Sequence, residues 1–291
     1  MYDQSRFSKL RRVAGCLFSL VFFVSCSSPV WSGDFSIVSL NIHYLVPETD
    51  RTGWAERKHA VSAALNDLNP DIVAFQEMET FERGHFSSKN IQLDWVMSNN
   101  DGYSVGAYGS PEDFPITQPI LYKTDRFSLS DQGFFFFSDD PDTPYSKPWR
   151  GDWPAFATWV LLKDVDSNQE IYVFNVHLDA YSRVNRIRSA DLIRNRVDSR
   201  RRSNVPVIVA GDFNSLRRSR VIRLLADDLM RPVRLKGSTF HFGRGLNLYG
   251  PIDHVLHTPG IQPVESVVVQ KKWNARWPSD HHPVFVSFQW H

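Results

Sequence analysis

Short apolar and β-branched runs that end in acids, amides or histidines constrain this chain more than any other feature. Phe35–Leu40 leads into Asn41, and Asp71–Phe75 leads into Gln76-Glu77. Runs of this length and composition are typical of buried β-strands. Loops at strand ends expose polar groups above a rigid core, so functional side chains gather there. The sequence therefore predicts a β framework whose chemistry lies at the strand ends.

Helical spacing separates several of these predicted strands. Apolar residues recur at helical intervals in Trp54–Leu68, which Asn69-Pro70 would terminate. The other predicted helices are Ser182–Arg202 and Arg220–Leu229, and the other predicted strands are Ile120–Tyr122, Ala157–Leu162, Ile171–Val176, Val205–Ala210, Ile252–Leu256 and Pro283–Phe288. The chain has no repeat and no low-complexity linker. The pattern therefore favours a single α/β domain in which two sheets pack face to face and helices lie outside.

The first 33 residues differ from the rest of the chain. Four basic residues stand within residues 6–12, and an apolar run follows at Val13–Val24. The run is short for a transmembrane span, and its flanks match a secretory signal peptide. Two processing routes stay open: a lipoprotein signal with Cys26 as the lipidated first residue, or general signal-peptidase cleavage at Val30-Trp31-Ser32. We expect residues 1–33 to be a signal peptide or lipoprotein signal, and the protein to be periplasmic, an envelope lipoprotein or secreted.

Cysteine content and charge exclude several classes of site. Both cysteines, Cys16 and Cys26, lie in the leader, so residues 34–291 offer no disulfide, thiolate metal site or cysteine nucleophile. The formal net charge is +1, and residues 1–32 contribute +3 from four basic side chains and one acid, which leaves −2 for the remainder. Composition therefore gives no strongly basic footprint for non-specific nucleic-acid binding.

Carboxylates and amides after the predicted strands suit a metal-dependent hydrolase. Glu77 could hold a hard divalent cation, although a lone loop glutamate is as often merely solvated. Asp212 and Asn214 stand two residues apart, so an extended backbone points both side chains to one side. The carboxylate can orient or deprotonate water, and the amide can contact a phosphoryl oxygen. Gly211-Asp212-Phe213-Asn214 can also be an ordinary turn, with Gly211 allowing a phosphate to approach closely.

Histidines complete the candidate set. His177 shares one face of its strand with Asn175 and Asp179, an unusual polar grouping for a buried strand. Asp280 directly precedes His281, and a neighbouring carboxylate can set the protonation of a histidine. The chain contains no His-Glu-x-x-His and no phosphate loop ending in Gly-Lys-Ser/Thr. Oxygen donors therefore dominate, which favours Mg²⁺, with Mn²⁺ or Ca²⁺ as alternatives.

The polar motifs also stand in a characteristic order. They are Asn41, Gln76-Glu77, Asn175-Val176-His177-Leu178-Asp179, Gly211-Asp212-Phe213-Asn214, Ile252-Asp253-His254 and Ser279-Asp280-His281-His282-Pro283. This set resembles the endonuclease/exonuclease/phosphatase superfamily over Phe35 to Phe288. The segment Asp113–Tyr122 and the aromatic region after it, together with Trp54 and Arg57, look most like the exported bacterial branch of that superfamily. The resemblance implies a deoxyribonuclease I-like four-layer α/β sandwich over residues 34–291, with two packed mixed β-sheets flanked by helices. It also implies Mg²⁺-dependent phosphoester hydrolysis, with water attacking phosphorus.

The resemblance implies a role for each matched position. The expected metal-binding residues are Asn41, Glu77 and Asp253. The expected catalytic residues are His177, Asp212, Asn214, Asp280 and His281. The expected substrate-binding residues are Asn175, Asp179 and Arg57. Asp212 would activate the attacking water, and Asp280 would fix His281, which would stabilise the pentacovalent phosphate. His254 stands where relatives often have tyrosine, and His282 falls on a variable position without an assigned role.

The substrate stays open at this level. Arginines in Arg183–Arg202 and Arg217–Arg223 would suit nucleic acid, but solvated helix faces explain them equally simply. Aromatics in Phe134–Phe137 and Trp149–Trp159 are expected mostly in the core, with a lipid or base platform as the alternative. We therefore expect a monomer acting on a nucleic-acid, small or lipid phosphoester, with membrane contact through an N-terminal lipid. The alternative is a catalytically inactive envelope binding module of the same fold.

Overall fold

The computed structural model describes residues 33–291 except residues 83–84, 202–203 and 227. Residues 1–32 lie outside the described residues, so signal processing and lipidation stay predictions. No helix within the described part of the chain is both long and apolar enough to span a membrane.

Two six-stranded sheets form the framework. The first has the order β13-β14-β1-β2-β6-β5, with bounds Ile261–Val268, Val284–Trp290, Phe35–Asn41, Ile72–Gln76, Ile120–Lys123 and Tyr103–Gly106. The second has the order β11-β12-β10-β9-β8-β7, with bounds Arg231–Pro232, Asp253–His257, Val207–Asp212, Glu170–His177, Phe156–Asp164 and Phe127–Phe136. Both sheets are mixed, because β1–β2 and β9–β10 are parallel while their other strand pairs are antiparallel.

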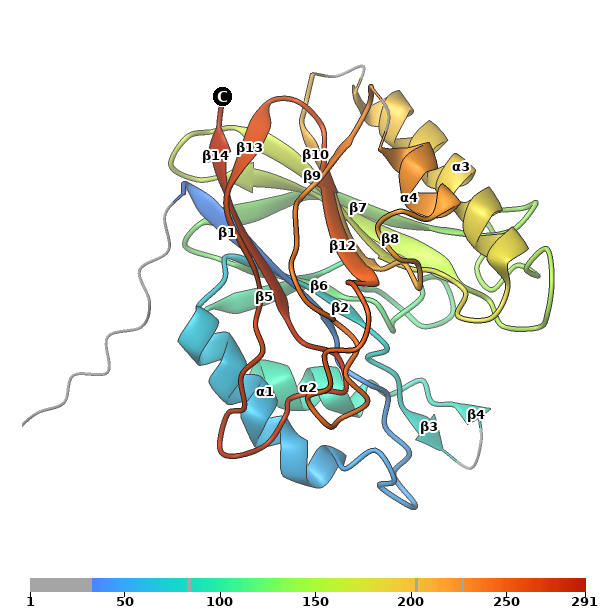
Figure 1. Cartoon of the computed structure of the whole chain (residues 1–291), viewed down its shortest axis with the longest axis vertical. Coiled ribbons are helices and arrows are strands. Elements are labelled where there is room, and N and C mark those ends of the chain that lie inside the picture. Colours follow the sequence, from blue (N-terminus) through green and yellow to red (C-terminus); the bar gives the residue numbers. More distant parts are fainter. Residues whose placement is uncertain (1–32, 83–84, 202–203, 227) are drawn as a thin grey trace, which may run out of the picture.

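Helices cover the outer face of each sheet, which gives four layers (Figure 1). The helices are α1 (Trp54–Leu68), α2 (Ile91–Ser98), α3 (Arg183–Arg201) and α4 (Arg220–Leu225), and a small hairpin is made by β3 (Phe81–Glu82) and β4 (His85–Phe86). α1 and α2 pack on the first sheet, and α3 and α4 pack on the second. The predicted four-layer α/β sandwich is confirmed.

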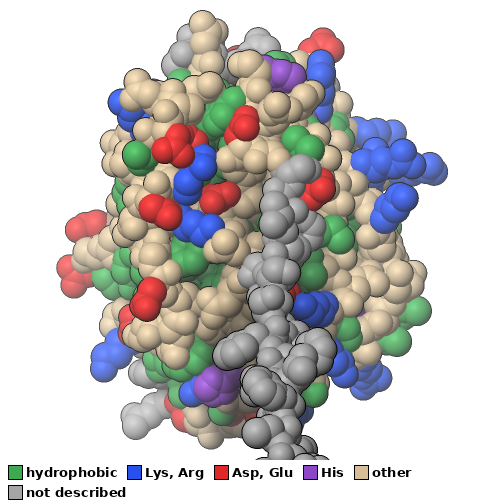
Figure 2. Space-filling model, turned by 90° about the vertical axis from the view of Figure 1, so that its left-hand side faces the viewer, with side chains coloured by type: hydrophobic (Ala, Val, Ile, Leu, Met, Phe, Trp, Pro, Cys, Tyr) green, Lys and Arg blue, Asp and Glu red, His purple; other side chains and the backbone are tan. Residues whose placement is uncertain are grey.

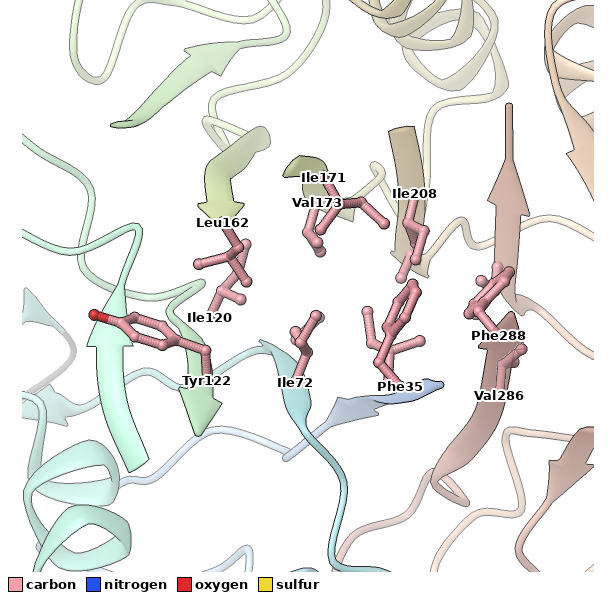
Figure 3. Packing of buried hydrophobic residues seen from close by; sticks show 14 of the residues in the cluster. Phe35, Ile72, Ile120, Tyr122, Leu162, Ile171, Val173, Ile208, Val286 and Phe288 are labelled. Atoms are coloured by element: carbon pink, nitrogen blue, oxygen red, sulfur yellow. The ribbon is translucent and has the colours of Figure 1, made fainter. Parts of the chain in front are cut away.

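The central core lies between the two sheets. Figure 3 shows Leu162, Val173 and Ile208 of the second sheet facing Ile72 and Phe35 of the first. Alternation along each strand sends one set of side chains into this layer and the other set under the helices. Full burial of each such side chain contributes about 1.5–3 kcal/mol, so the interleaved layer holds the strand ends in fixed positions.

Local sequence explains the bounds of α1. The carboxylate of Asp50 accepts from the backbone N–H groups of Trp54 and Ala55 at 2.6 and 3.0 Å, which caps the helix start. Asn69 closes the helix in the left-handed region (φ 46°), and Pro70 follows. The predicted helix is therefore confirmed with the same bounds.

Edge strands escaped the prediction. β7 and β13 lie at sheet edges and bury only some of their side chains, so their sequences lack a continuous apolar run. The predicted helix Arg220–Leu229 was too long, because α4 ends at Leu225. Leu229 is nevertheless buried against the same cluster, which accounts for its apolar character.

Candidate active site

Strand register places three of the predicted residues side by side. His177 ends β9, Asp212 ends β10 and Asp253 begins β12. Asp212 is the Cα partner of His177 in the parallel pair and of Asp253 in the antiparallel pair. Because neighbouring strands lie about 4.8 Å apart, register alone sets these three residues in a row at one edge of the second sheet.

Asn41 connects this row to the first sheet. It ends β1, is buried, and its Nδ2 donates to Glu77 Oε1 at 3.0 Å and to Asp212 Oδ2 at 3.2 Å. His177 Nε2 lies 3.7 Å from that Glu77 oxygen and 3.8 Å from that Asp212 oxygen. The structure therefore brings Asn41, Glu77, His177 and Asp212 together from both sheets.

The turns that follow these strands adopt left-handed backbone conformations. Glu77 has φ 52°, Asn214 has φ 46° and His43 has φ 63°. Such conformations cost non-glycine residues on the order of 1–3 kcal/mol each and tend to cluster at functional sites. Asn214 is also fixed by hydrogen bonds, since its N–H donates to Asp212 Oδ1 and its Nδ2 donates to Leu178 O, each at 2.8 Å.

Gly211 serves the packing of the strands rather than a phosphate. Its φ is 147°, and a Cβ at this position would lie 1.9 Å from the carbonyl oxygen of Val176. Gly211 and Val176 are partners in the β9–β10 ladder. The expected close approach therefore exists, but its partner is the neighbouring strand, and it permits the pairing that aligns Asp212 with His177.

Asp253, not Asp280, holds His281. Nδ1 of His281 lies 2.9 Å from Asp253 Oδ2, and both side chains are buried. Nε2 of His281 lies 3.8 Å from Asp212 Oδ2. Burial alone would lower the pKa of His281, but the charge and hydrogen bond of Asp253, together with Asp212 and Asp280, raise it to about 10. His281 is therefore a buried imidazolium facing the Asp212 carboxylate.

The two buried aspartates respond oppositely to their surroundings. Burial and then the charge of Asp253 raise the pKa of Asp212 to about 6, against the opposing effects of His281 and His177. Burial would also raise the pKa of Asp253, but the charge and hydrogen bond of His281 lower it overall. Asp253 therefore stays ionised beside His281, while Asp212 can exchange a proton near neutral pH.

Asp280 pairs with a histidine that sequence reasoning missed. His43 Nδ1 lies 3.6 Å from Asp280 Oδ1, and each side chain is about one quarter exposed. Burial lowers the pKa of His43, and the Asp280 charge opposes that effect. The prediction that Asp280 fixes His281 was therefore wrong. His43 could have been noticed because it follows Asn41 by two residues, the spacing of one strand face.

Arg57 has no free donor for a substrate. All five of its N–H groups point at backbone carbonyls, which belong to Thr52, Ile42, Pro278, His43 and Tyr44. The side chain is also buried. The predicted substrate-binding role was wrong, and Arg57 instead fixes the loop after β1 against the loop before His281.

Asn175 and Asp179 are likewise occupied by the protein itself. Asn175 is fully buried, accepts from Gln76 Nε2 at 2.7 Å and donates to Phe75 O at 2.6 Å, so it ties β9 to β2 beneath the site. Asp179 accepts from the N–H groups of Tyr181 and Ser182 at 2.7 Å each, ordering the start of α3. Burial therefore leaves Asn175 no direct contact with substrate, whereas the contact predicted for the partly exposed Asp179 stays a prediction.

Two overlapping groups of side chains could hold a divalent cation. Ligand atoms of Asp212, Asp253 and His281 all lie within 4.8 Å of one another, but Asp253 and His281 already bind each other. Glu77 and Asp212 offer an alternative oxygen pair, because both carboxylates converge on Asn41 Nδ2. Oxygen ligands are those that Mg²⁺ prefers, and the Glu77 side chain is 23% exposed. The donor set at Glu77 and Asp212 therefore fits a hard cation reached from solvent.

Several arginines of helix α3 are engaged by acids or by the backbone. Arg188 pairs with Asp139 at 2.7 Å, Arg196 pairs with Asp142 at 2.6 Å, and Arg186 donates to two backbone carbonyls. Figure 2 shows the side of the molecule away from α3, where acidic and basic side chains of the described residues are interspersed. The arginines therefore behave as solvated and paired helix faces.

The aromatic segment is mainly core, as predicted. Phe135, Phe136 and Phe137 are at most 2% exposed, whereas Trp153 is 50% exposed. Trp149 lies under the Arg188 guanidinium, 4.3 Å from ring centroid to carbon. Trp153 also contacts the Phe81 ring, with ring centroids 5.8 Å apart, so most of the ring area of this segment packs against the protein itself.

The fold and the geometry of the site together indicate the class of protein. Two packed mixed sheets carry carboxylates, an amide and histidines at their common edge, the arrangement of a deoxyribonuclease I-like phosphoesterase. The chain belongs to the endonuclease/exonuclease/phosphatase family, whose model matches residues 38–281. Members of this family are metal-dependent hydrolases of phosphoesters.

Solved structures share the architecture over nearly the whole chain. The mannosyl-6-phosphatase of Bacteroides thetaiotaomicron is 24% identical with a TM-score of 0.77, covering 88% of this chain and 99% of that one. TDP2 of D. rerio, complexed with a single-strand DNA product, is 15% identical with a TM-score of 0.63, covering 87% and 98%. At these identities the likeness establishes the fold.

Curated relatives are longer proteins. The Ccr4 3'-5'-exoribonuclease subunit of the Candida albicans CCR4-Not complex is 24% identical over 341 aligned positions, covering 90% of this chain and 42% of that protein. The chain spans about half the length of the curated relatives it matches.

Proposed function

We propose that this protein is a Mg²⁺-dependent hydrolase that cleaves a phosphoester by attack of water at phosphorus. The observation that carries the proposal is the position of Asp212. This buried carboxylate lies within 3.2–3.8 Å of Asn41, His177 and His281, which come from both sheets and from the C-terminal loop. The same geometry offers a base, a metal-binding oxygen pair and positive charge around one small volume.

Each side chain has a chemical task in this scheme. Asp212 orients the water and takes its proton. His281 remains protonated and stabilises the negative charge that develops on the non-bridging oxygens, with help from His177 and Asn214. A cation bound at Glu77 and Asp212 would supply further charge neutralisation and polarise the phosphoryl oxygen. Asp253 keeps His281 protonated and fixes the orientation of its ring through the hydrogen bond to Nδ1.

A small or lipid phosphoester is favoured over duplex nucleic acid. Arg186, Arg188 and Arg196 of α3 are paired with acids or with the backbone, which weakens the clearest candidate for a nucleic-acid surface. The Bacteroides relative acts, according to its name, on a sugar phosphate. We therefore extend to this chain a phosphoester of a compact alcohol as the substrate class.

The test is hydrolysis of bis-p-nitrophenyl phosphate and p-nitrophenyl phosphate with Mg²⁺, with and without chelator. We expect chelator-sensitive turnover, and Asp212→Asn should lower kcat by roughly 10³-fold because it removes the base. Asp228→Asn, a change of an exposed aspartate, serves as the matched control and should retain activity. Full turnover in a folded Asp212→Asn protein would sink the proposal.

An inactive binding module is the competing possibility. It predicts binding of a phosphoester without turnover by the wild-type protein under any divalent cation.

We further propose that export of this protein depends on residues 1–33. Fractionation of cells producing the full chain, with mass determination of the mature N-terminus, would identify cleavage, lipidation at Cys26 or retention in the cytoplasm.

A further inference from the structure

A large cavity opens beside the candidate active site. Its volume is about 810 Å³, and its lining includes His43, Ser279, Asp280 and Phe240. The Phe240 ring lies against His281, with ring centroids 4.9 Å apart. A molecule in this cavity would therefore be adjacent to a phosphate held at His281, on the side where an alcohol leaving group could extend.

The cavity is cationic although the domain around it is not. Its lining includes five cationic side chains and two carboxylates: Arg51, Arg57, Arg244, Lys272, Arg276, Glu56 and Asp280. The chain after residue 32, in contrast, carries a formal charge of −2. Positive charge gathered in a concave site of an otherwise acidic domain favours an anionic ligand.

Three of these cations are available to such a ligand. Arg57 is used by backbone carbonyls, and Arg276 pairs with Glu56 at 2.8 Å. Among the residues that the structure describes, Arg51, Arg244 and Lys272 form no ion pair. Arg51 donates one long hydrogen bond to the Tyr44 hydroxyl, at 3.4 Å, and Lys272 lies 5.3 Å from the Trp277 ring centroid.

The remaining lining can accommodate a carbon skeleton. Phe242, Leu246 and Leu248 line the same cavity and are 45%, 38% and 61% exposed. The hydroxyl oxygen of Thr52, another lining residue, is buried and has no hydrogen-bond partner. Cations, an unpartnered hydroxyl and apolar side chains together suit an organic anion rather than a free inorganic ion.

We propose that this cavity holds the alcohol half of the substrate and selects an alcohol that carries a second phosphate group of its own. The inference rests on the proposed hydrolase function. Water adds to the scissile phosphorus, the P–O bond to the alcohol breaks, and the alcohol oxygen takes a proton. The second phosphate remains intact on the departing alcohol, held by Arg51, Arg244 and Lys272.

Competitive inhibition of bis-p-nitrophenyl phosphate hydrolysis tests the proposal directly. Fructose 1,6-bisphosphate should inhibit with a Ki at least about tenfold lower than fructose 1-phosphate or fructose 6-phosphate, because the second phosphate gains charge-assisted hydrogen bonds. The double variant Arg244→Gln/Lys272→Gln should lose this preference, measured as the ratio of the Ki values within that variant. Arg223→Gln removes an exposed cation outside the cavity and should keep the preference.

Equal Ki values for the mono- and bisphosphates, or a preference that survives the double variant, would overturn the inference. Vesicles of phosphatidylcholine with and without cardiolipin, a lipid with two phosphates, form a second arm. Stronger inhibition by cardiolipin than by the soluble bisphosphate assigns the second phosphate to a lipid, and the reverse assigns it to a soluble compound. Calorimetric titration of the Asp212→Asn variant with the same sugar phosphates keeps the test valid if the hydrolase function itself fails.

Discussion

Two aspartate–histidine pairs lie next to each other in this protein, because Asp280 of one pair directly precedes His281 of the other. They differ in distance, in exposure and in the pKa of the histidine. In one pair, His281 Nδ1 and Asp253 Oδ2 are 2.9 Å apart, and the side chains are 7% and 2% exposed. In the other, His43 Nδ1 and Asp280 Oδ1 are 3.6 Å apart, and the side chains are 25% and 24% exposed. The pKa of His281 is raised to about 10, whereas that of His43 is lowered.

The difference shows that proximity of an acid does not by itself charge a histidine. A buried pair with a short, directed hydrogen bond interacts strongly because little water screens it. A looser pair at the surface is screened, so partial burial of the imidazole dominates and lowers the pKa of His43. The buried pair is therefore suited to stabilising charge in the reaction, and the open pair to contacting what enters the neighbouring cavity.

Removing the histidine of the buried pair should have the largest effect. His281→Gln takes away the imidazolium that faces Asp212, and we expect kcat on bis-p-nitrophenyl phosphate to fall by roughly 10³-fold or more. His257→Gln changes a buried histidine at the other end of β12 and is the matched control. Activity of folded His281→Gln within tenfold of wild type would contradict the assignment.

Removing the acid of the buried pair should have a smaller but distinctive effect. Asp253→Asn leaves His281 in place without its main source of charge stabilisation, so kcat should fall by about 10²-fold. The pKa of His281, followed by NMR of the imidazole, should drop well below 10, and the free energy of unfolding should fall by about 3–5 kcal/mol because a buried pair is broken. An unchanged His281 pKa would show that Asp253 does not control it.

The buried pair should also make stability depend on pH. The pKa of His281 is about 10 in the folded protein against an ordinary value of 6.5, so the folded state binds the proton more tightly. The resulting stability is fully present below pH 6.5 and is lost as pH rises through 10. We expect Tm to fall between pH 7 and 10, and to fall less steeply in His281→Gln. Parallel Tm curves for the two proteins would refute a raised pKa.

The residues of the site differ in whether they could be predicted from the sequence. Strand ends such as Asn41, Glu77 and Asp212 were identified because each follows a local apolar run. The partner of His281 could not be inferred, since Asp280 and His281 are adjacent and adjacent residues in an extended chain point to opposite sides. Asp253 lies 28 positions before His281 in sequence, and only the folded structure brings the two side chains together.

Buried polar residues account for other errors in the predicted substrate-binding set. Arg57 and Asn175 are polar groups within apolar surroundings, a pattern shared by catalytic residues and by residues that satisfy the backbone. Only the hydrogen-bond partners in the folded protein separate the two. The cationic cavity was equally invisible, because Arg51, Arg244 and Lys272 come from three loops far apart in sequence.

Breaking the His43–Asp280 pair should have the smallest effect on catalysis. Asp280→Asn removes the charge beside His43 and only the last-ranked contribution to the raised pKa of His281. We therefore expect the pKa of His281 to stay well above 6.5, and kcat on bis-p-nitrophenyl phosphate to fall by less than about tenfold, because solvent partly screens this ion pair. A loss as large as that of Asp253→Asn would mean that Asp280, rather than Asp253, sustains the charge of His281, and would erase the distinction between the two pairs.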